Sequence, residues 1–193
     1  MKVLIDDKIQ TYSADEIARW TALLPQWRRE RVEAIKHDAG RRQSLLAFRL
    51  LCQGLREEYG IAELPPFSFN EHNKPHWDEG LALPHFSLSH CREAAACVID
   101  ERPCGIDIES RGRKVSDSLI RYAMNEEEQH EISQAEDSAL TFLRLWTRKE
   151  AVLKLIGTGI RDTMKDVLRN CPYDVETRET ERYVLSIATQ PCS

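Results

Sequence analysis

The stretch FSLSHCREAAACVIDERPCGIDIE, residues 86–109, decides the fold because it predicts three successive β-strands. Apolar and hydroxyl side chains alternate over residues 86–90, as they do in a strand whose two faces differ. An unbroken apolar run over residues 94–99 predicts a buried strand. A turn at residues 100–103 leads to a third alternating stretch, residues 105–109, so we expect the molecule to be built around these strands.

Before these strands, the sequence predicts a short strand followed by helices. The strand covers residues 3–5, and Ser13 and Glu16 have the spacing of a capping box that starts a helix. Residues 25–59 have a helical pattern, and Gly60 should end it.

Residues 64–84 are rich in Pro and Asn, which disfavour a regular helix, so we expect a loop with short strands flanking it. Beyond the three central strands, residues 117–132 and 138–156 predict helices, and Gly157 should end the second. Two closing strands are expected near residues 173–175 and 182–188. The expected class is therefore mixed α+β.

The composition is that of a compact globular protein. The 193 residues are 41% hydrophobic and 31% charged, and the net charge of −5 argues against a general nucleic-acid binder, which would carry a basic excess. The opening hydrophobic run is too short for a signal peptide, and no segment approaches the ~20 apolar residues of a membrane helix. The six cysteines form no CxxC pair, so we expect reduced thiols in a cytoplasmic protein.

The DxE pair Asp107 and Glu109 is the first candidate for chemistry. In a strand these two side chains lie on one face, and Ile106 and Ile108 lie on the other. Two converging carboxylates repel unless a cation or a proton compensates them, and Mg²⁺ prefers such oxygen ligands. For an isolated DxE, however, a solvated face of an edge strand is the more common explanation.

The second candidate is WTRKEAVLK, residues 146–154, in the predicted long helix. Trp146, Glu150 and Lys154 follow i, i+4, i+8 spacing and lie along one side of that helix. An ordinary surface salt bridge would have the same spacing. The Trp favours a packed face, on which Glu150 would add a metal ligand and Lys154 would neutralise a phosphate.

Other polar residues are individually ambiguous. His90 at a strand end is more often a structural hydrogen-bonder than a ligand, and Ser89 beside it has no identifiable general base, which disfavours a serine hydrolase. The role of Lys74, in the loop of residues 64–84, is similarly ambiguous. A basic run can be a solvated helix face or a phosphate site; it comprises Arg28, Arg29, Arg31, Lys36, Arg41 and Arg42.

Four motifs in this order resemble the 4′-phosphopantetheinyl transferase family, most closely the monomeric type that includes the surfactin synthetase activator. They are NKP at residues 73–75, FSLSH at 86–90, GIDIE at 105–109 and WTRKEAVLK at 146–154. The similarity extends from about residue 28 to the closing strands. The resemblance implies a pseudo-twofold arrangement of two similar α+β halves, residues 1–103 and 104–193, with coenzyme A bound in the cleft between them.

The resemblance also implies roles for individual residues. Asp107, Glu109 and Glu150 match the Mg²⁺ ligands, and Lys154 matches the lysine that contacts the phosphate under attack. The remaining matches are coenzyme A contacts: Lys74, Ser89, His90 near the 3′-phosphate, and the N-terminal basic residues Arg28, Arg31 and Arg42.

The sequence departs from the family pattern at three places. Asn73 replaces the usual glycine before the Lys-Pro pair, and Cys91 replaces the usual serine after Ser-His. Neither change removes a charged group from the expected site. Three acids, residues 126–128, stand where the family commonly has one, and Glu127 is the residue that we match to that position.

The expected reaction is transfer of phosphopantetheine from coenzyme A to a serine of an apo acyl or peptidyl carrier protein. Glu150 is the candidate general base, and Arg111, Arg113 and Lys114 form a candidate docking patch for the acidic carrier. We expect a monomer that binds neither nucleic acid nor membrane. The alternatives are a metal-dependent phosphohydrolase with the same carboxylates and a non-catalytic protein that binds coenzyme A or a carrier.

Overall fold

The computed structural model describes residues 1–65, 67–72, 74–78, 82–159 and 162–191. Two three-stranded antiparallel sheets form the middle of the molecule, and in each of them the strand that comes last in the chain lies in the centre. The first sheet has the order β1 (Lys2–Asp6), β5 (Ala95–Asp100), β4 (His85–His90), and the second has the order β6 (Cys104–Ser110), β8 (Tyr183–Thr189), β7 (Asp174–Glu179).

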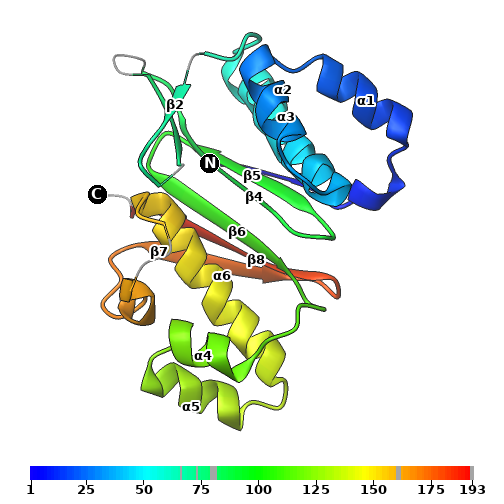
Figure 1. Cartoon of the computed structure of the whole chain (residues 1–193). Helices are drawn as coiled ribbons and strands as arrows, with labels where there is room; N and C mark the ends of the chain where they lie inside the picture. The colour runs from blue at the N-terminus through cyan, green and yellow to red at the C-terminus, as the bar shows by residue number, and fades with distance from the viewer. Residues whose placement is uncertain (66, 73, 79–81, 160–161, 192–193) are drawn as a thin grey trace.

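One long helix packs on each sheet (Figure 1): α3 (Asp38–Tyr59) on the first and α6 (Ser138–Ile156) on the second. The shorter elements are α1 (Ala14–Ala22), α2 (Gln26–Glu33), the hairpin β2 (Phe67–Phe69) and β3 (Pro75–Trp77), α4 (Asp117–Ala123), α5 (Glu126–Gln134) and the 3₁₀ turns Ile9–Thr11 and Asp162–Asp166. The predicted α+β class is confirmed. Pseudo-twofold symmetry stays a prediction, although both sheets share one strand order.

The two sheets pack against each other through a buried apolar layer. Ala96 and Val98 of β5 lie in one cluster with Ile106 and Ile108 of β6 and Leu185 of β8. This contact fixes the orientation of β6, because its isoleucines face the first sheet and its acidic residues therefore face α6. The molecule thus has four layers, in the order helix, sheet, sheet, helix.

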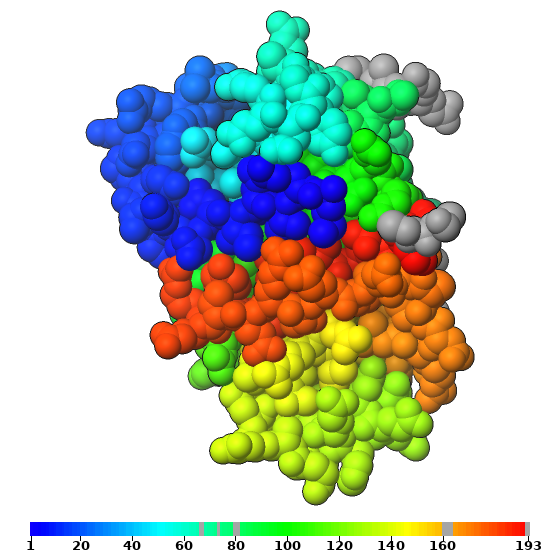
Figure 2. Space-filling view, turned by 180° about the vertical axis from the view of Figure 1, so that it is seen from behind, coloured from blue at the N-terminus to red at the C-terminus, as the bar shows by residue number. Residues whose placement is uncertain are grey.

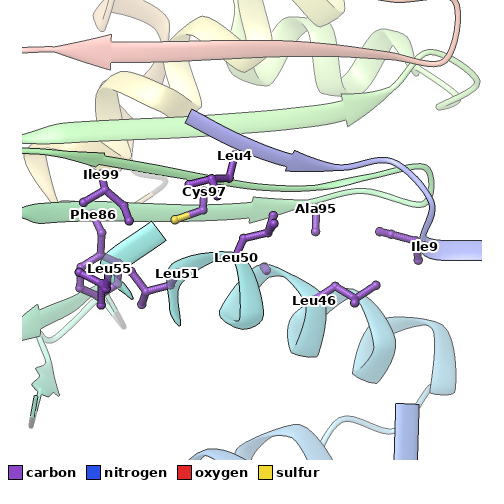
Figure 3. Close-up of a cluster of buried hydrophobic side chains, with 11 residues drawn as sticks. Leu4, Ile9, Leu46, Leu50, Leu51, Leu55, Phe86, Ala95, Cys97 and Ile99 are labelled. Atoms are coloured by element: carbon purple, nitrogen blue, oxygen red, sulfur yellow. The ribbon is translucent and has the colours of Figure 1, made fainter. Parts of the chain in front are cut away.

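The outer face of the first sheet is covered by α3 (Figure 3). Leu46, Leu50 and Leu55 recur at helical spacing and pack against Cys97 and Ile99 of β5. These side chains are 7% exposed or less, so the helix is held mainly by burial of one apolar stripe.

Strands β4 and β6 meet through serine side chains. The Ser87 hydroxyl oxygen accepts a hydrogen bond from the Ile106 amide (3.2 Å), and the Ser89 hydroxyl oxygen accepts one from the Ile108 amide (3.3 Å). These amides lie on the edge of β6 that does not pair with β8, where unpaired buried donors would be costly. The alternating serines of FSLSH therefore join the two sheets at the edge where the acidic residues of β6 lie.

On the opposite side of the molecule, the start of the chain contacts the closing strands. Figure 2 shows the N-terminal residues, in blue, directly above the orange residues of the second sheet. Arg182 forms an ion pair with Asp7 and donates a further hydrogen bond to the Asp7 carbonyl (3.1 Å). Within the described ranges, no helix combines the length and apolar character that a bilayer span needs.

Several predicted boundaries are confirmed. Ser13 and Glu16 form a complete capping box at the start of α1, and Gly60 ends α3 in the left-handed conformation (φ 67°). Helix α6 covers the predicted residues, and Gly157 (φ 85°) ends it. In these places a local hydrogen bond or a left-handed residue fixes the end, so the sequence signal is strong.

Three predictions were wrong in detail. Residues 25–59 form two helices, because His37 adopts an extended conformation (φ −103°, ψ 131°) between α2 and α3. Residues 117–132 also form two helices, because Met124 is extended and Asn125 caps a new helix with Glu128. The short strands β2 and β3 lie within residues 64–84 and pair with each other, rather than flanking a loop.

Candidate active site

The acid cluster, defined here as Asp107, Glu109 and Glu150, lies between β6 and α6. Asp107 and Glu109 point from the face of β6 that α6 covers, and Glu150 comes from α6 itself. Asp107 is 5% exposed and Glu150 is 9% exposed, so both carboxyl groups are largely removed from water. Close packing at Gly105 allows this approach, because a Cβ atom there would lie 2.0 Å from the Ala151 carbonyl oxygen.

Lys154 provides a positive charge at one side of the acid cluster. Its Nζ donates to Asp107 Oδ1 (2.7 Å) and to the Ser89 hydroxyl (2.9 Å), and Ser89 in turn donates to Asp107 Oδ1 (2.9 Å). These contacts connect β4, β6 and α6. Lys154 and Glu150 are one helical turn apart, as the sequence spacing predicts.

Glu109 is held at the other side of the cluster. Its Oε1 accepts a hydrogen bond from Trp146 Nε1 (3.1 Å) and forms an ion pair with Arg113. The Arg113 guanidinium also lies over the Trp146 ring, 4.7 Å from the centroid. Arg113 therefore neutralises part of the acid cluster, although the sequence suggested that it faces a partner protein.

Two carboxylate oxygens of the cluster have no hydrogen-bond donor. Asp107 Oδ2 and Glu150 Oε1 are buried and make no hydrogen bond. Burial, followed by the charges of Asp107 and Glu109, raises the pKa of Glu150 to about 7. Burial and the Asp107 charge also raise the pKa of Glu109. The three carboxyl groups are thus close enough for their charges to repel each other.

These unpartnered oxygens fit a hard divalent cation. Two buried carboxylate oxygens without donors, next to a third carboxylate, are the oxygen-only ligand set that Mg²⁺ accepts. In the described parts of the chain, however, no three His, Cys, Asp or Glu side chains are already grouped as a metal cage. Arg113 and Lys154 form ion pairs with Glu109 and Asp107.

A cavity of about 400 Å³ opens beside the acid cluster. Arg28 and Arg31 of α2 line it together with Asp107, Lys154 and His90 at the end of β4. Residues of both chain halves therefore line this cavity. A smaller cavity of about 250 Å³ adjoins Glu150 and Lys154 on the side of Lys74.

The two arginines of the larger cavity each contact another residue of its lining. Arg28 donates to the carbonyl (2.7 Å) and the hydroxyl (2.8 Å) of Ser44, and Arg31 lies 3.8 Å from the centre of the Phe69 ring. Burial, with the neighbouring charge of Arg31, lowers the pKa of Arg28 to about 10. Such a desolvated cation gains an anionic partner at little ordering cost.

His90 faces the same positive surroundings. The protein around the ring and the positive charges of Lys154 and Arg28 lower its pKa, although its side chain still contacts solvent in the cavity. A phosphate in this cavity would reverse that shift and favour the protonated ring.

Two expected coenzyme contacts have protein partners in this structure. Arg42 donates to the carbonyl oxygens of Tyr12 (2.6 Å) and Ile9 (3.2 Å), which ties α3 to the first 3₁₀ turn, and it lies outside both cavities described above. Lys74 Nζ donates to the Leu155 carbonyl (2.8 Å) at the end of α6 while lining the smaller cavity.

The remaining sequence candidates are distributed as follows. Arg111 forms an ion pair with Asp137 (3.5 Å), so of the basic loop only Lys114 is fully exposed. Cys91 is buried beside Glu93, and Asn73 lies outside the described residues.

Sequence reasoning missed a buried ion pair behind the site. Lys149 is fully buried, and its Nζ donates to Glu128 (2.6 Å) and to the backbone carbonyls of Ala123, Met164 and Lys165. Glu127, which we matched to the family acid, is exposed. The Asn-x-x-Glu spacing of a capping box could have singled out Glu128 instead.

Ser44 and Phe69 were also missed, since neither carries a charge or belongs to a recognisable motif. Both line the larger cavity, where they position Arg28 and Arg31. Only the folded arrangement of α3 and the β2–β3 hairpin brings these residues together.

Comparisons with known proteins all point to one family. A family model described as the 4′-phosphopantetheinyl transferase superfamily matches residues 103–190. A 4′-phosphopantetheinyl transferase of Bacillus subtilis is 28% identical over 77% of this chain and 66% of its own length. The enzyme AcpT of Salmonella typhimurium is 35% identical over 61% of this chain and 60% of its own length.

A third relative, the 4′-phosphopantetheinyl transferase gsp of Aneurinibacillus migulanus, is 36% identical over 49% of this chain and 39% of its own length. The chain thus spans less than two thirds of the length of these relatives. The matched segment contains β6 and α6, which carry the acid cluster and Lys154. Over residues 103–190 the chain is therefore similar to the 4′-phosphopantetheinyl transferase superfamily, and the three relatives above carry the same description.

Proposed function

We propose that this chain transfers the phosphopantetheine group of coenzyme A to a serine of an apo carrier protein. The observation that supports this function is a cavity lined by Asp107, Glu109 and Lys154 together with Arg28 and Arg31, while Glu150 lines the adjoining smaller cavity. Coenzyme A has a diphosphate, at which the group transfer takes place, and a separate 3′-phosphate. It therefore needs one site that stabilises charge on the diphosphate and a second, cationic site that binds the 3′-phosphate. Both are available within one cavity.

Arg28, Arg31 and His90 would bind the nucleotide phosphates in the larger cavity, and Ser89, Lys74 and Arg42 are further proposed contacts. Guanidinium forks suit terminal phosphate oxygens, and a cation that is already held by Ser44 or Phe69 loses little freedom on binding. Lys74 would exchange its bond with the Leu155 carbonyl for a phosphate oxygen.

Asp107, Glu109 and Glu150 would hold Mg²⁺, which when bound neutralises charge on the diphosphate oxygens and aligns them. Lys154 would offset the negative charge that develops on the phosphate under attack. The serine oxygen of the carrier forms a bond to the β-phosphorus, the bond to the bridging oxygen breaks, and adenosine 3′,5′-bisphosphate leaves.

Glu150 would accept the proton of the serine hydroxyl. Burial raises the pKa of Glu150 to about 7 in the metal-free site, so this carboxyl group can take up a proton near neutral pH. The carrier would approach from the side of Lys114 and Arg111, since carrier domains are usually acidic. We further propose a cytoplasmic monomer with halves at residues 1–103 and 104–193.

The deciding test is mass spectrometry of an apo carrier protein incubated with this chain, Mg²⁺ and coenzyme A. We expect a mass gain of one phosphopantetheine, lost in Asp107→Ala and retained in Glu127→Ala, an exposed acid on α5. Absence of any gain across several carriers would contradict the proposal. Release of phosphate or nucleotide without a carrier would indicate a phosphohydrolase.

A further inference from the structure

A further cavity lies away from the acid cluster. It has a volume of about 580 Å³ and lies between α1, the start of α2 and the outer side of α3. The strand β6 and the helix α6, which carry the acid cluster, lie on the other side of the first sheet (Figure 1). A volume of this size is typical of pockets for small organic molecules. Nothing in the proposed reaction uses this cavity.

The wall of the cavity is mainly apolar. Trp20, Leu24, Phe48 and Leu64 contribute to it, and Leu23 at the rim is 82% exposed. An exposed large apolar side chain at the rim of an apolar pocket indicates a binding surface, because a ligand would remove that side chain from water.

Two arginines provide the charge of the cavity. Arg49 lies 3.5 Å from the centre of the Trp20 ring, and Arg56 is exposed two turns further along α3. Burial raises the pKa of Cys52 between them, and Arg56 and Arg49 are among the cations that oppose this rise. Both guanidinium groups are therefore electrostatically coupled to the same part of the cavity.

No carboxylate within the described residues forms an ion pair with either arginine. Glu57 also lines the cavity, but it accepts a hydrogen bond from Gln53 (3.0 Å). Glu16 is near enough for Arg49 to lower its pKa, after the larger effect of Ser13, which binds the Glu16 carboxylate in the capping box. The arginines thus keep free donors toward the cavity.

We infer that this cavity is a second binding site, for a small carboxylate with an apolar body, such as a free medium-chain fatty acid. The apolar chain would lie along the Trp20 and Phe48 wall, and the carboxylate would bind Arg49 and Arg56 at the rim. Arginine forks match carboxylate geometry, and burial of the chain supplies the non-directional part of the affinity.

Isothermal titration calorimetry with decanoate, below its micelle concentration, tests this site. Binding should weaken about tenfold in Arg49→Gln/Arg56→Gln, because hydrogen bonds to charged groups are lost. Ala62→Trp, at an exposed position of the rim, should block the cavity without touching the core. Arg169→Gln removes an exposed arginine that does not line this cavity and should leave binding unchanged.

A second readout locates the ligand. Decanoate should slow alkylation of Cys52, followed by peptide mass spectrometry, and leave Cys171 unaffected as the internal control. Equal protection by decanol would overturn the assignment of an anion site, and absence of decanoate binding would overturn the site itself. Neither assay needs a carrier or coenzyme A, so this inference stands or fails independently of the proposed transfer activity.

Discussion

At the scale of single residues, Glu150 makes the metal-free site sensitive to pH. Its pKa is raised to about 7 in the folded protein, from an ordinary value of 4.5. The folded state therefore binds the proton more tightly than the unfolded state does. The resulting stabilisation is complete below the ordinary value and is lost as the pH rises toward 7.

We predict that Glu150→Gln is more stable than the parent protein at pH 8 in the presence of a chelator, by an amount on the order of 3 kcal/mol. Near pH 4.5 the two proteins should unfold at similar urea concentrations. Glu127→Gln is the matched control, because that side chain is exposed, and it should show no such pH dependence. Equal stability of Glu150→Gln and the parent at pH 8 would show that burial and the neighbouring carboxylates do not destabilise the ionised Glu150 side chain.

Lys149 makes a second prediction at this scale. Its ammonium group is completely buried and bonded to Glu128, so removal of the lysine leaves an unpaired carboxylate in the interior. We expect Lys149→Met to lower the free energy of unfolding by about 3–5 kcal/mol. Urea denaturation should show partial recovery in Lys149→Met/Glu128→Gln, and Lys114→Met, at an exposed position, should have little effect. A harmless Lys149→Met would contradict the buried pair.

At the scale of elements, the contact between β6 and α6 sets the position of the acid cluster. A side chain at Gly105 would place its Cβ 2.0 Å from the Ala151 carbonyl oxygen and 2.5 Å from the Leu155 amide nitrogen. Backbone atoms cannot yield as a side chain can, so the helix would have to move.

We predict that Gly105→Ala destabilises the protein by about 1–3 kcal/mol or more and reduces transfer activity beyond the loss of folded protein. Gly112→Ala is the control, because a Cβ there lies 3.4 Å from only a flexible Arg92 side chain. Thermal unfolding and activity of both variants check this. Full activity of Gly105→Ala would show that the helix position is less critical than we infer.

How far sequence predicts the elements depends on the local signals. Gly60 and the Ser13 capping box end or start helices by their own conformation, and both were predictable. The break at His37 has no glycine or proline, so a helical pattern continued through it in the prediction. The hairpin of β2 and β3 was missed because each strand has only three residues. So short a strand gives no recognisable alternating pattern in the sequence.

At the scale of the whole molecule, the two chain halves share one interior. Ala96 and Val98 of the first half pack against Ile106 and Leu185 of the second, so either half alone would expose an apolar sheet face. The alternating pattern predicted Asp107 and Glu109 on one face, but only the family resemblance indicated that the helix carrying Glu150 would cover that face. Arg113 shows how far sequence alone can predict the site. Its side chain points toward Glu109 and lies over the Trp146 ring, so its orientation depends on the position of that tryptophan.

We therefore predict a single cooperative unfolding transition. Cys97 in the first sheet and Cys104 in the second are both buried, so pulse alkylation in increasing urea reports on each half separately. The two labelling midpoints should coincide, since loss of one sheet removes the support of the other. Well-separated midpoints would mean that the halves are independent domains.

The central claim is that Asp107, Glu109 and Glu150 together hold one divalent ion. Electron paramagnetic resonance with Mn²⁺ in place of Mg²⁺, in the presence of coenzyme A, measures this directly. We predict one tightly bound Mn²⁺ per chain, with affinity reduced at least about tenfold in Asp107→Asn and in Glu150→Gln and unchanged in Glu127→Gln. Unaltered Mn²⁺ affinity in both site variants would contradict the account.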